Sequence, residues 1–298
     1  MLNLRMAAHA CLVVIFAVTG GAAAASTAGA APNGANMATG CLTGSAADTL
    51  ERANENVHIA WTEGESGAVL EAVNLRPVAA EIIMSARSGE KAADRTLVLP
   101  PFARAKLFEF AGLNRDAAAA KARADWRISS YMGDPAVIVP DLDYRYRLPF
   151  KSGASSRLVQ GYGGTISHQS EPSRYALDFQ LGVGEPVHAA RDGVVVRAVD
   201  WFCEAGGPEL ISRVNMIIIL HGDGSLAHYV HLDHRGLLVK EGDRVARGQH
   251  IGFVGMTGYT SGPHLHFVVM RERDVAIPIK FSGYEDRDLS RPGRFRAP

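Results

Sequence analysis

The sequence predicts a mostly β protein with two domains, on three observations. Short apolar runs rich in Val and Ile recur along the chain, and several of them alternate in polarity as half-buried strands do. Glycines separate these runs at the spacing of hairpins and tight turns. A chain of 298 residues, 47% of them hydrophobic, can bury more than one core.

The beginning of the chain predicts an export signal followed by a linker. Arg5 precedes an apolar stretch at residues 10–18, and small residues follow at 20–25. This order is typical of a secretory signal peptide, here residues 1–25. The apolar stretch is shorter than the roughly 20 residues that a membrane-spanning helix needs, so we expect no stable transmembrane anchor. Residues 26–47 are rich in small side chains and predict a flexible linker.

Residues 48–148 predict a small β-sandwich. Short strands separated by turns favour this architecture. An Ala-rich segment at 116–124 predicts one helical stretch among the strands. The runs that we interpret as strands are 57–62, 68–75, 81–86, 95–99, 105–110, 126–131 and 144–148.

Residues 149–282 predict a second β domain, and residues 283–298 a polar C-terminal tail. Pro149 and the polar stretch 151–156 mark the boundary. Further runs that we interpret as strands are 194–199, 216–220, 251–254 and 267–270. Their Gly-rich separators favour a compact, mostly antiparallel domain. The basic stretch 287–296 is interpreted as solvated.

The second domain contains the residues of a zinc hydrolase. Four histidines and one carboxylate occur in the order His168, Asp178, His231, His264 and His266. In an extended segment residues two apart share a face, so His264 and His266 can point into one site. A catalytic zinc needs about three His, Asp or Glu ligands and an open position, which His168, Asp178 and His266 supply. A single histidine is most often structural, so the prediction depends on all five together.

The same residues lie in motifs that resemble the lysostaphin-type zinc metalloendopeptidases, which are peptidoglycan hydrolases. The resemblance covers about residues 148–280 and implies a lysostaphin-type antiparallel β-sheet peptidase domain, similar to a barrel-sandwich hybrid. It implies one Zn²⁺ bound by His168, Asp178 and His266, with His231 and His264 acting beside the metal. The motifs are Ser-His at 167–168, Tyr-Ala-Leu-Asp-Phe at 175–179, Tyr-Val-His-Leu at 229–232 and Gly-Pro-His-Leu-His-Phe at 262–267.

The chain departs from the family pattern at two places. Nine residues separate His168 from Asp178, where many members have three. Doubling a loop costs only about 0.6 kcal/mol of closure entropy, so both residues can still reach one metal. Val268 stands where a Glu commonly follows the Phe, but this position is not among the ligands. The zinc prediction therefore stands.

The resemblance implies an exported enzyme, periplasmic or extracellular, that hydrolyses peptide cross-links of peptidoglycan. Its partners would be stem peptides or cross-bridges, and the N-terminal sandwich resembles an Ig-like accessory domain found ahead of some members. The alternative is a catalytically silent module of the same fold that binds cell wall or activates another hydrolase. Such modules generally lose zinc ligands, and this chain retains them. Whether His231 or His264 is the general base stays open.

Other interpretations of the sequence are weaker. Residues 239–252 also resemble the hairpin of biotinyl and lipoyl carrier domains, but no lysine there lies in the setting that is modified. The formal net charge of +0 gives no electrostatic case for nucleic-acid binding. Cys41 and Cys203 could pair in an oxidising compartment. By strand alternation His228 is expected to face away from the site, while Tyr229 lines either the cleft or the core.

Overall fold

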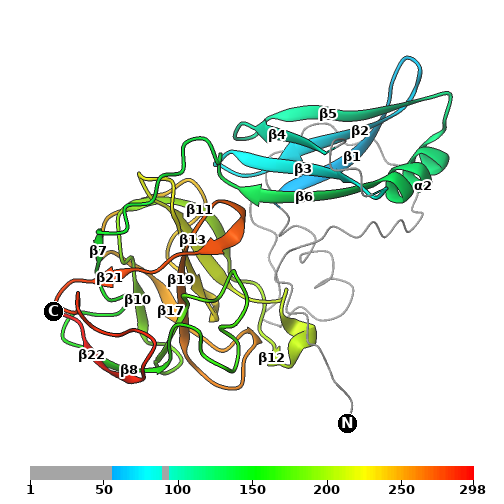
Figure 1. The fold of residues 1–298 in the computed structure, drawn as a ribbon. Helices are drawn as coiled ribbons and strands as arrows, with labels where there is room; N and C mark the ends of the chain where they lie inside the picture. Colours follow the sequence, from blue (N-terminus) through cyan, green and yellow to red (C-terminus); the bar gives the residue numbers. More distant parts are fainter. Residues whose placement is uncertain (1–55, 89–93) are drawn as a thin grey trace, which may run out of the picture.

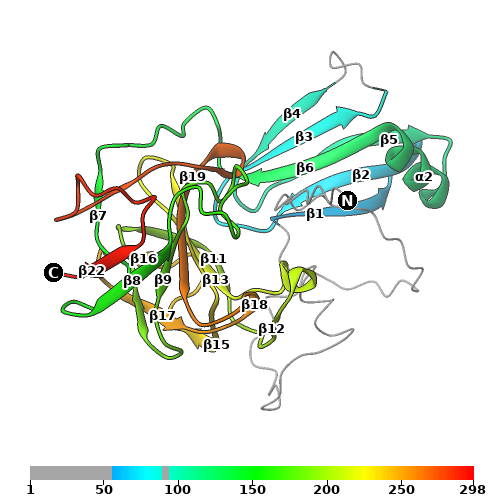
Figure 2. The ribbon, with the colours of Figure 1, turned by 60° about the horizontal axis from the view of Figure 1, so that its bottom comes forward.

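The computed structural model describes residues 56–88 and 94–298. The predicted signal peptide and linker, together with Cys41, lie outside these residues, and Cys203 is disulfide-bonded. The described chain is mostly β, and most of its strand pairs are antiparallel. It forms an N-terminal part and a C-terminal part that lie side by side (Figures 1 and 2).

The N-terminal part consists of two three-stranded antiparallel sheets around one apolar core. Leu70 and Ile82, one from each sheet, are fully buried in this core. The six strands lie where the first six runs predict them, whereas the Ig-like character of the sandwich stays a prediction. One sheet has the order β1 (Val57–Glu63), β2 (Gly67–Asn74), β5 (Arg104–Ala111), and the other β4 (Arg95–Leu99), β3 (Ala80–Ala86), β6 (Trp126–Met132).

A single α-helix among the described residues, α2 (Arg115–Asp125), covers one end of this core. The Asn114 side chain caps it by accepting a hydrogen bond from the Ala117 N–H at 3.0 Å. Ala118 and Ala122 are fully buried against the sheets. The helix ends at Trp126, where the backbone becomes extended and β6 begins.

The seventh predicted sandwich strand belongs to the C-terminal part instead. β7 (Arg145–Tyr146) pairs in parallel with β21 (Lys280–Phe281). Tyr146 and Leu148 are buried in the core of the C-terminal part. The prediction was wrong because local alternation shows that a run forms a strand but not which sheet it joins.

The C-terminal part is built on a nine-stranded sheet, as the antiparallel prediction requires. Its order is β16 (Arg244–Val245), β11 (Gly193–Val199), β13 (Met216–Leu220), β14 (Leu226–Val230), β19 (Leu265–Arg271), β9 (Leu177–Gln180), β8 (Ser155–Gln160), β22 (Gly293–Arg296), with β20 (Val275–Ala276) beside β19. A smaller antiparallel sheet has the order β10 (Pro186–His188), β17 (His250–Val254), β15 (Leu232–Leu237). The short strands β12 (Ala205–Gly206) and β18 (Gly258–Tyr259) pair in parallel, and η2 (Pro208–Leu210) and η3 (Glu272–Asp274) are 3-10 turns.

The main core lies between the large and the small sheet. It determines which side chains of the large sheet point away from this core. Leu265, Phe267 and Val269 of β19 point into this core together with Ile251 of β17. Side chains alternate along a strand, so His266 points to the opposite face of the large sheet. The candidate site must therefore lie on that opposite face.

The C-terminal residues do not form the solvated tail that the basic stretch suggested. β22 pairs with β8 at the edge of the large sheet, and Phe295 is 1% exposed. Arg294 and Arg296 point outward on either side of it. The tail prediction was wrong because the arginines conceal the few apolar residues that enter the core, Leu289, Phe295 and Ala297.

The two parts contact each other through an apolar cluster and two ion pairs. Val78 and Met132 of the N-terminal part pack against Ile218 of the large sheet. Glu81, 1% exposed, accepts hydrogen bonds from Nη2 and Nε of Arg273 at 2.8 and 3.0 Å. Arg273 lies in η3, directly after β19. The N-terminal sandwich therefore holds the end of the strand that contains His266.

Replacing Arg273 with methionine is expected to lower the free energy of unfolding by about 1–3 kcal/mol, because the Glu81 carboxylate would remain buried without its cation. Urea unfolding of the full chain measures the change. Arg104→Met is the matched control, since the ion pair of Arg104 with Glu71 spans 3.4 Å and the arginine is more exposed, so a change below about 0.5 kcal/mol is expected. Equal effects of both variants would contradict a special role for the buried pair.

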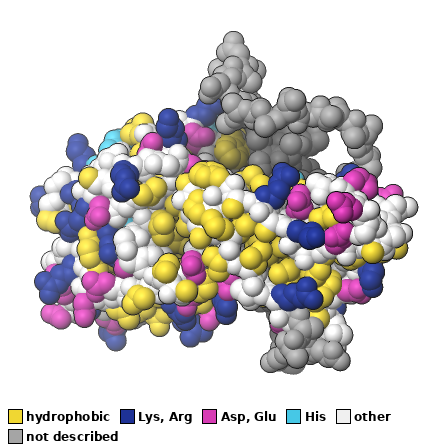
Figure 3. All heavy atoms as spheres, turned by 90° about the horizontal axis from the view of Figure 1, so that it is seen from above, with side chains coloured by type: hydrophobic (Ala, Val, Ile, Leu, Met, Phe, Trp, Pro, Cys, Tyr) yellow, Lys and Arg dark blue, Asp and Glu magenta, His cyan; other side chains and the backbone are white. Residues whose placement is uncertain are grey.

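The surface shows no field of one sign on the face seen in Figure 3. Lys and Arg side chains are interspersed with Asp and Glu, and hydrophobic side chains gather between them (Figure 3). This mixture agrees with the formal net charge of +0. Within residues 56–88 and 94–298, no helix has the length and apolar character needed to cross a membrane.

Candidate metal centre

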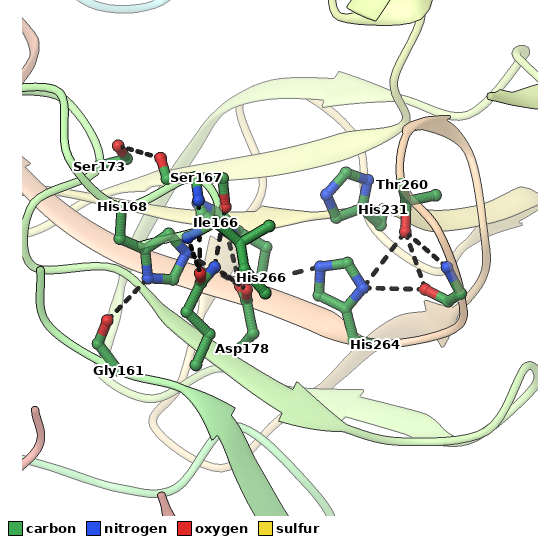
Figure 4. A network of polar contacts seen from close by, with 12 residues as sticks. Gly161, Ile166, Ser167, His168, Ser173, Asp178, His231, Thr260, His264 and His266 are labelled. Carbon is green, nitrogen blue, oxygen red and sulfur yellow. Dashed lines mark hydrogen bonds and ion pairs between the residues drawn. The ribbon is translucent and has the colours of Figure 1, made fainter. Parts of the chain in front are cut away.

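Three of the predicted residues converge on the face of the large sheet that points away from the main core. One ligand atom from each of His168, Asp178 and His266 lies within 4.8 Å of the other two. Nε2 of His168 is 3.3 Å from Oδ1 of Asp178, and Nδ1 of His266 is 2.9 Å from the same oxygen (Figure 4). Both imidazoles therefore face a single carboxylate oxygen.

Strand register places two of these residues, and a loop places the third. Asp178 on β9 is directly opposite His266 on β19, and cross-strand neighbours on one face are close enough for their side chains to interact. His168 lies in the loop between β8 and β9 and is fully buried. Its backbone N–H donates to the Gly164 carbonyl at 3.0 Å, which ties it to the start of this loop.

Hydrogen bonds to carbonyl oxygens determine the tautomers of three histidines. A carbonyl can only accept, so the ring nitrogen that faces it must carry the proton. Nδ1 of His168 donates to Gly161 O at 2.9 Å. In the same way Nδ1 of His231 donates to the Thr257 carbonyl at 2.7 Å, and Nδ1 of His264 donates to the Gly262 carbonyl at 2.9 Å. In each neutral ring Nε2 keeps its lone pair.

The electrostatic state of the group suits a cation. Burial alone would raise the pKa of Asp178, but its contacts with His168 and His266 hold that pKa well below the usual range. Burial lowers the pKa of His266, against the opposing effect of Asp178. The carboxylate is thus ionised near neutral pH, and metal ligands must be in their deprotonated forms.

The residues fit a zinc ion by two tests. Tetrahedral zinc has ligand bonds of about 2.0–2.2 Å, which places ligand atoms about 3.3 Å apart, close to the 3.3 and 2.9 Å found here. The buried Nε2 of His168 also has no hydrogen-bond partner within the part of the chain that the structure describes, because its approach to Asp178 lacks hydrogen-bond geometry. A metal ion would satisfy that lone pair.

His231 and His264 lie beside this group, on its open side. Their ring centroids are 4.6 Å apart, and Nε2 of His264 is 3.7 Å from Oδ1 of Asp178. Burial, followed by the neighbouring imidazoles, lowers the pKa of His231 to about 3, so this ring is neutral near pH 7. The structure therefore brings all five predicted site residues together.

The structure decides the alternative for Tyr229 and revises the expectation for His228. Tyr229 lies in the main core, where its hydroxyl accepts a hydrogen bond from the Ala190 N–H at 2.8 Å. His228 pairs with Val268, so it faces the same side of the sheet as His266, and the expectation that it faces away is wrong. The alternation fails at His231, whose φ of 64° lies in the left-handed region and turns its side chain.

Sequence reasoning missed three residues that support the site. Gln160 on β8 is directly opposite Asp178, at an inward position of an alternating strand, and this buried position was the one available signal. Thr257 supplies the carbonyl that His231 contacts. Thr260 Oγ1 lies 3.3 Å from Nδ1 of His264. No sequence pattern identified the two threonines.

The segment before His264 is joined to the loop at residues 201–213. β12 of that loop pairs with β18, which ends five residues before His264. Asn215, fully buried, bonds to the backbone N–H and C=O of Phe202 at 2.9 and 2.7 Å. These bonds fix both ends of the loop, and the Asn215 N–H also donates at 3.0 Å to Oγ1 of Thr257, whose carbonyl His231 contacts.

Comparison with known proteins places the similarity in the C-terminal part. A family model described as Peptidase family M23 matches residues 172–278, which include Asp178 and His266 but not His168. The chain is 40% identical over 99 residues to peptidoglycan DD-endopeptidase ShyA of Vibrio cholerae serotype O1, covering 33% of this chain and 20% of that protein. It is 41% identical over 138 residues to glycyl-glycine endopeptidase ALE-1 of Staphylococcus capitis, covering 44% and 35%. The chain thus spans only about a fifth to a third of the length of these relatives.

Solved structures give similar matches. The catalytic domain of lysostaphin from Staphylococcus simulans is 31% identical, with a TM-score of 0.28, and the match covers 48% of this chain and 86% of that one. A zinc-containing peptidase from Vibrio cholerae is 19% identical, with a TM-score of 0.35, and the match covers 70% of this chain and 54% of that one.

Proposed function

We propose that this chain, whose residues 172–278 match the model of peptidase family M23, is a zinc metalloendopeptidase that hydrolyses peptide cross-links of bacterial peptidoglycan. The observation that supports the proposal most is the convergence of His168, Asp178 and His266, with two further imidazoles on the open side. ShyA is a peptidoglycan DD-endopeptidase and ALE-1 a glycyl-glycine endopeptidase. We therefore propose stem peptides or cross-bridges as the substrate.

In this proposal His168, Asp178 and His266 hold one zinc ion through Nε2, Oδ1 and Nδ1. A zinc ion bound there would lower the pKa of a water molecule toward about 7 and polarise the scissile carbonyl. The ionised Asp178 provides its ligand atom without prior loss of a proton from the carboxylate. Three protein ligands leave one position for water or substrate.

His231 and His264 would handle protons and the developing negative charge. Nε2 of each ring has a lone pair, so either ring can accept a proton from the attacking water. The imidazolium formed in this way can then donate to the oxyanion or to the leaving amine. Hydrogen bonds from Nδ1 to backbone carbonyls hold both rings in place during this exchange.

We further propose that the protein acts outside the cytoplasm, in the periplasm or beyond, after removal of a signal peptide at residues 1–25. The strands β1 to β6 would form the accessory domain, and the strands β7 to β22 the peptidase domain. The ion pair of the buried Glu81 with Arg273 supports a fixed position of the accessory domain beside the catalytic sheet.

The proposal is tested by zinc content and by muropeptide release from isolated sacculi. The purified full chain is expected to contain one zinc and to reduce the cross-linked muropeptides, and a chelator should stop this release. His266→Ala should abolish both properties, while His250→Ala, which alters a histidine stacked on His188 outside the site, should retain them. Bound zinc without any cleavage would indicate autoinhibition or a required partner, whereas the absence of zinc would support the catalytically silent, wall-binding alternative.

A further inference from the structure

Gln160 lies between two of the three proposed ligands, Asp178 on β9 and His168 in the loop before β9. Its side chain is buried, and its Nε2 donates to Oδ2 of Asp178 and to Oγ of Ser167, both at 2.8 Å. Its Oε1 accepts from the backbone N–H groups of Ile166 and Ser167 at 3.1 and 3.3 Å (Figure 4). A carboxamide has two N–H donors and two lone pairs, so every one of its hydrogen-bonding positions is used.

This arrangement admits only one orientation of the carboxamide. A flipped amide would place Oε1 against the Asp178 carboxylate and Nε2 against two N–H groups. Both contacts would be repulsive. The network therefore fixes the Gln160 side chain, and through it the two groups that it joins.

We propose that Gln160 is a positioning residue of the metal centre, one that orients Asp178 and anchors the loop of His168 before the metal binds. Because Gln160 occupies Oδ2, the other carboxylate oxygen, Oδ1, faces the two imidazoles. The backbone of Ile166 and Ser167 is held at the same time, one residue before His168. The inference rests on the zinc site proposed above and adds Gln160 to the residues on which zinc binding depends.

The long loop makes such an anchor necessary. Nine residues separate His168 from Asp178, and each residue that the loop must order costs about 1–2 kcal/mol of conformational entropy. If this cost were met only on metal binding, it would weaken the affinity for zinc. An anchor within the apo protein removes part of that cost, as preorganisation does for other ligands.

Gly164 gives a second, independent observation. A Cβ added there would overlap Cγ of Gln160 and lie 2.8 Å from its Cδ. The loop thus passes directly over the carboxamide, and only a glycine allows this approach. The Gly164 carbonyl also accepts from the His168 N–H, so the same residue touches the anchor and the ligand.

The test measures zinc affinity of the full chain by competition with a chromophoric chelator, without any hydrolysis assay. Gln160→Glu keeps the size and one acceptor oxygen but sets a carboxylate oxygen against Asp178. We expect its zinc dissociation constant to rise about 10–100-fold, the usual effect of removing a partner of a metal ligand. Gln180→Glu, at the exposed last residue of β9, is the matched control, and no change above about twofold is expected there.

Two further variants separate positioning from stability. Gly164→Ala should weaken zinc binding about as much as Gln160→Glu, although no polar group is removed, while Gly222→Ala, at an open position, should not. Leu70→Ala lowers stability by leaving a cavity in the core of the N-terminal sandwich and should leave the zinc affinity unchanged. If Gln160→Glu does not fold, Gly164→Ala alone decides the question.

The outcomes distinguish this inference from the proposed function. If the Gln160→Glu and Gly164→Ala variants bind zinc within about twofold of the unaltered chain, Gln160 is not a positioning residue, whatever the fate of the site. If instead His266→Ala binds zinc as the unaltered chain does, the metal site itself is wrongly assigned. A loss in all three variants, with both controls unchanged, supports both conclusions.

Discussion

Asp178→Ala is expected to abolish stoichiometric zinc binding and to lower the release of muropeptides about 1,000-fold or more, since a catalytic metal contributes several kcal/mol to the transition state. Oδ1 of Asp178 is the one atom that both His168 and His266 face, so its loss leaves two imidazoles without the charge that joins them. Metal analysis and the sacculus assay measure the two effects. The unaltered chain should also gain about 2.7 kcal/mol of stability at zinc concentrations 100 times the dissociation constant, a gain that the variant should lack.

The control for this variant is Asp288→Ala, which removes an exposed carboxylate that pairs with Arg291. It should bind one zinc, retain activity and keep its zinc-dependent stability. An Asp178→Ala protein with a full equivalent of zinc would remove Asp178 from the metal site. An unfolded variant would be recognised from its circular dichroism and replaced by Asp178→Asn, for which the same loss of zinc is expected.

His231→Asn and His264→Asn are expected to keep zinc but to lose about 100- to 10,000-fold in hydrolysis, the range that general acid–base groups contribute. An asparagine amide can still donate to the carbonyl that each Nδ1 contacts, such as Thr257 O for His231. It offers no group that can accept a proton near neutral pH. The sacculus assay together with metal analysis of each variant checks the prediction.

Either histidine could prove to have another role, and the same assays would show it. Loss of zinc from one of these variants would make that histidine a ligand. Full activity of one variant would exclude that histidine from the proton transfer and leave the other as the sole base. His250→Ala, outside the site, serves as the control and should behave as the unaltered chain does.

Much of the fold could be predicted from local patterns. Six of the N-terminal runs form strands close to the expected limits, because each alternates over enough residues to specify one buried face. The helix α2 is longer than the predicted Ala-rich segment by one residue at each end, and Asn114 caps its N-terminus. The five site residues were identified from motifs, and the register of β9 with β19 explains why Asp178 and His266 meet.

The remaining features depend on contacts between residues distant in the sequence. β7 and β22 each join the C-terminal core through one apolar side chain, Tyr146 and Phe295 respectively. The other side chains of these two strands are arginines. Gln160 was missed because its importance lies in what it contacts across the loop, not in its own neighbours. The orientation of His228 was wrong because a single left-handed residue, His231, interrupts the alternation. Local periodicity contains none of this information.

The register of β9 with β19 also has a consequence for the order of events in folding. Asp178 and His266 are 88 residues apart in sequence and become neighbours only when their strands pair. Such distant pairing forms slowly, because a long loop must close before the contact contributes any stability. An unfolded chain therefore offers zinc no complete set of ligands. Zinc should leave the rate of refolding nearly unchanged and slow the rate of unfolding, so that the metal acts mainly by prolonging the lifetime of a structure that has already formed.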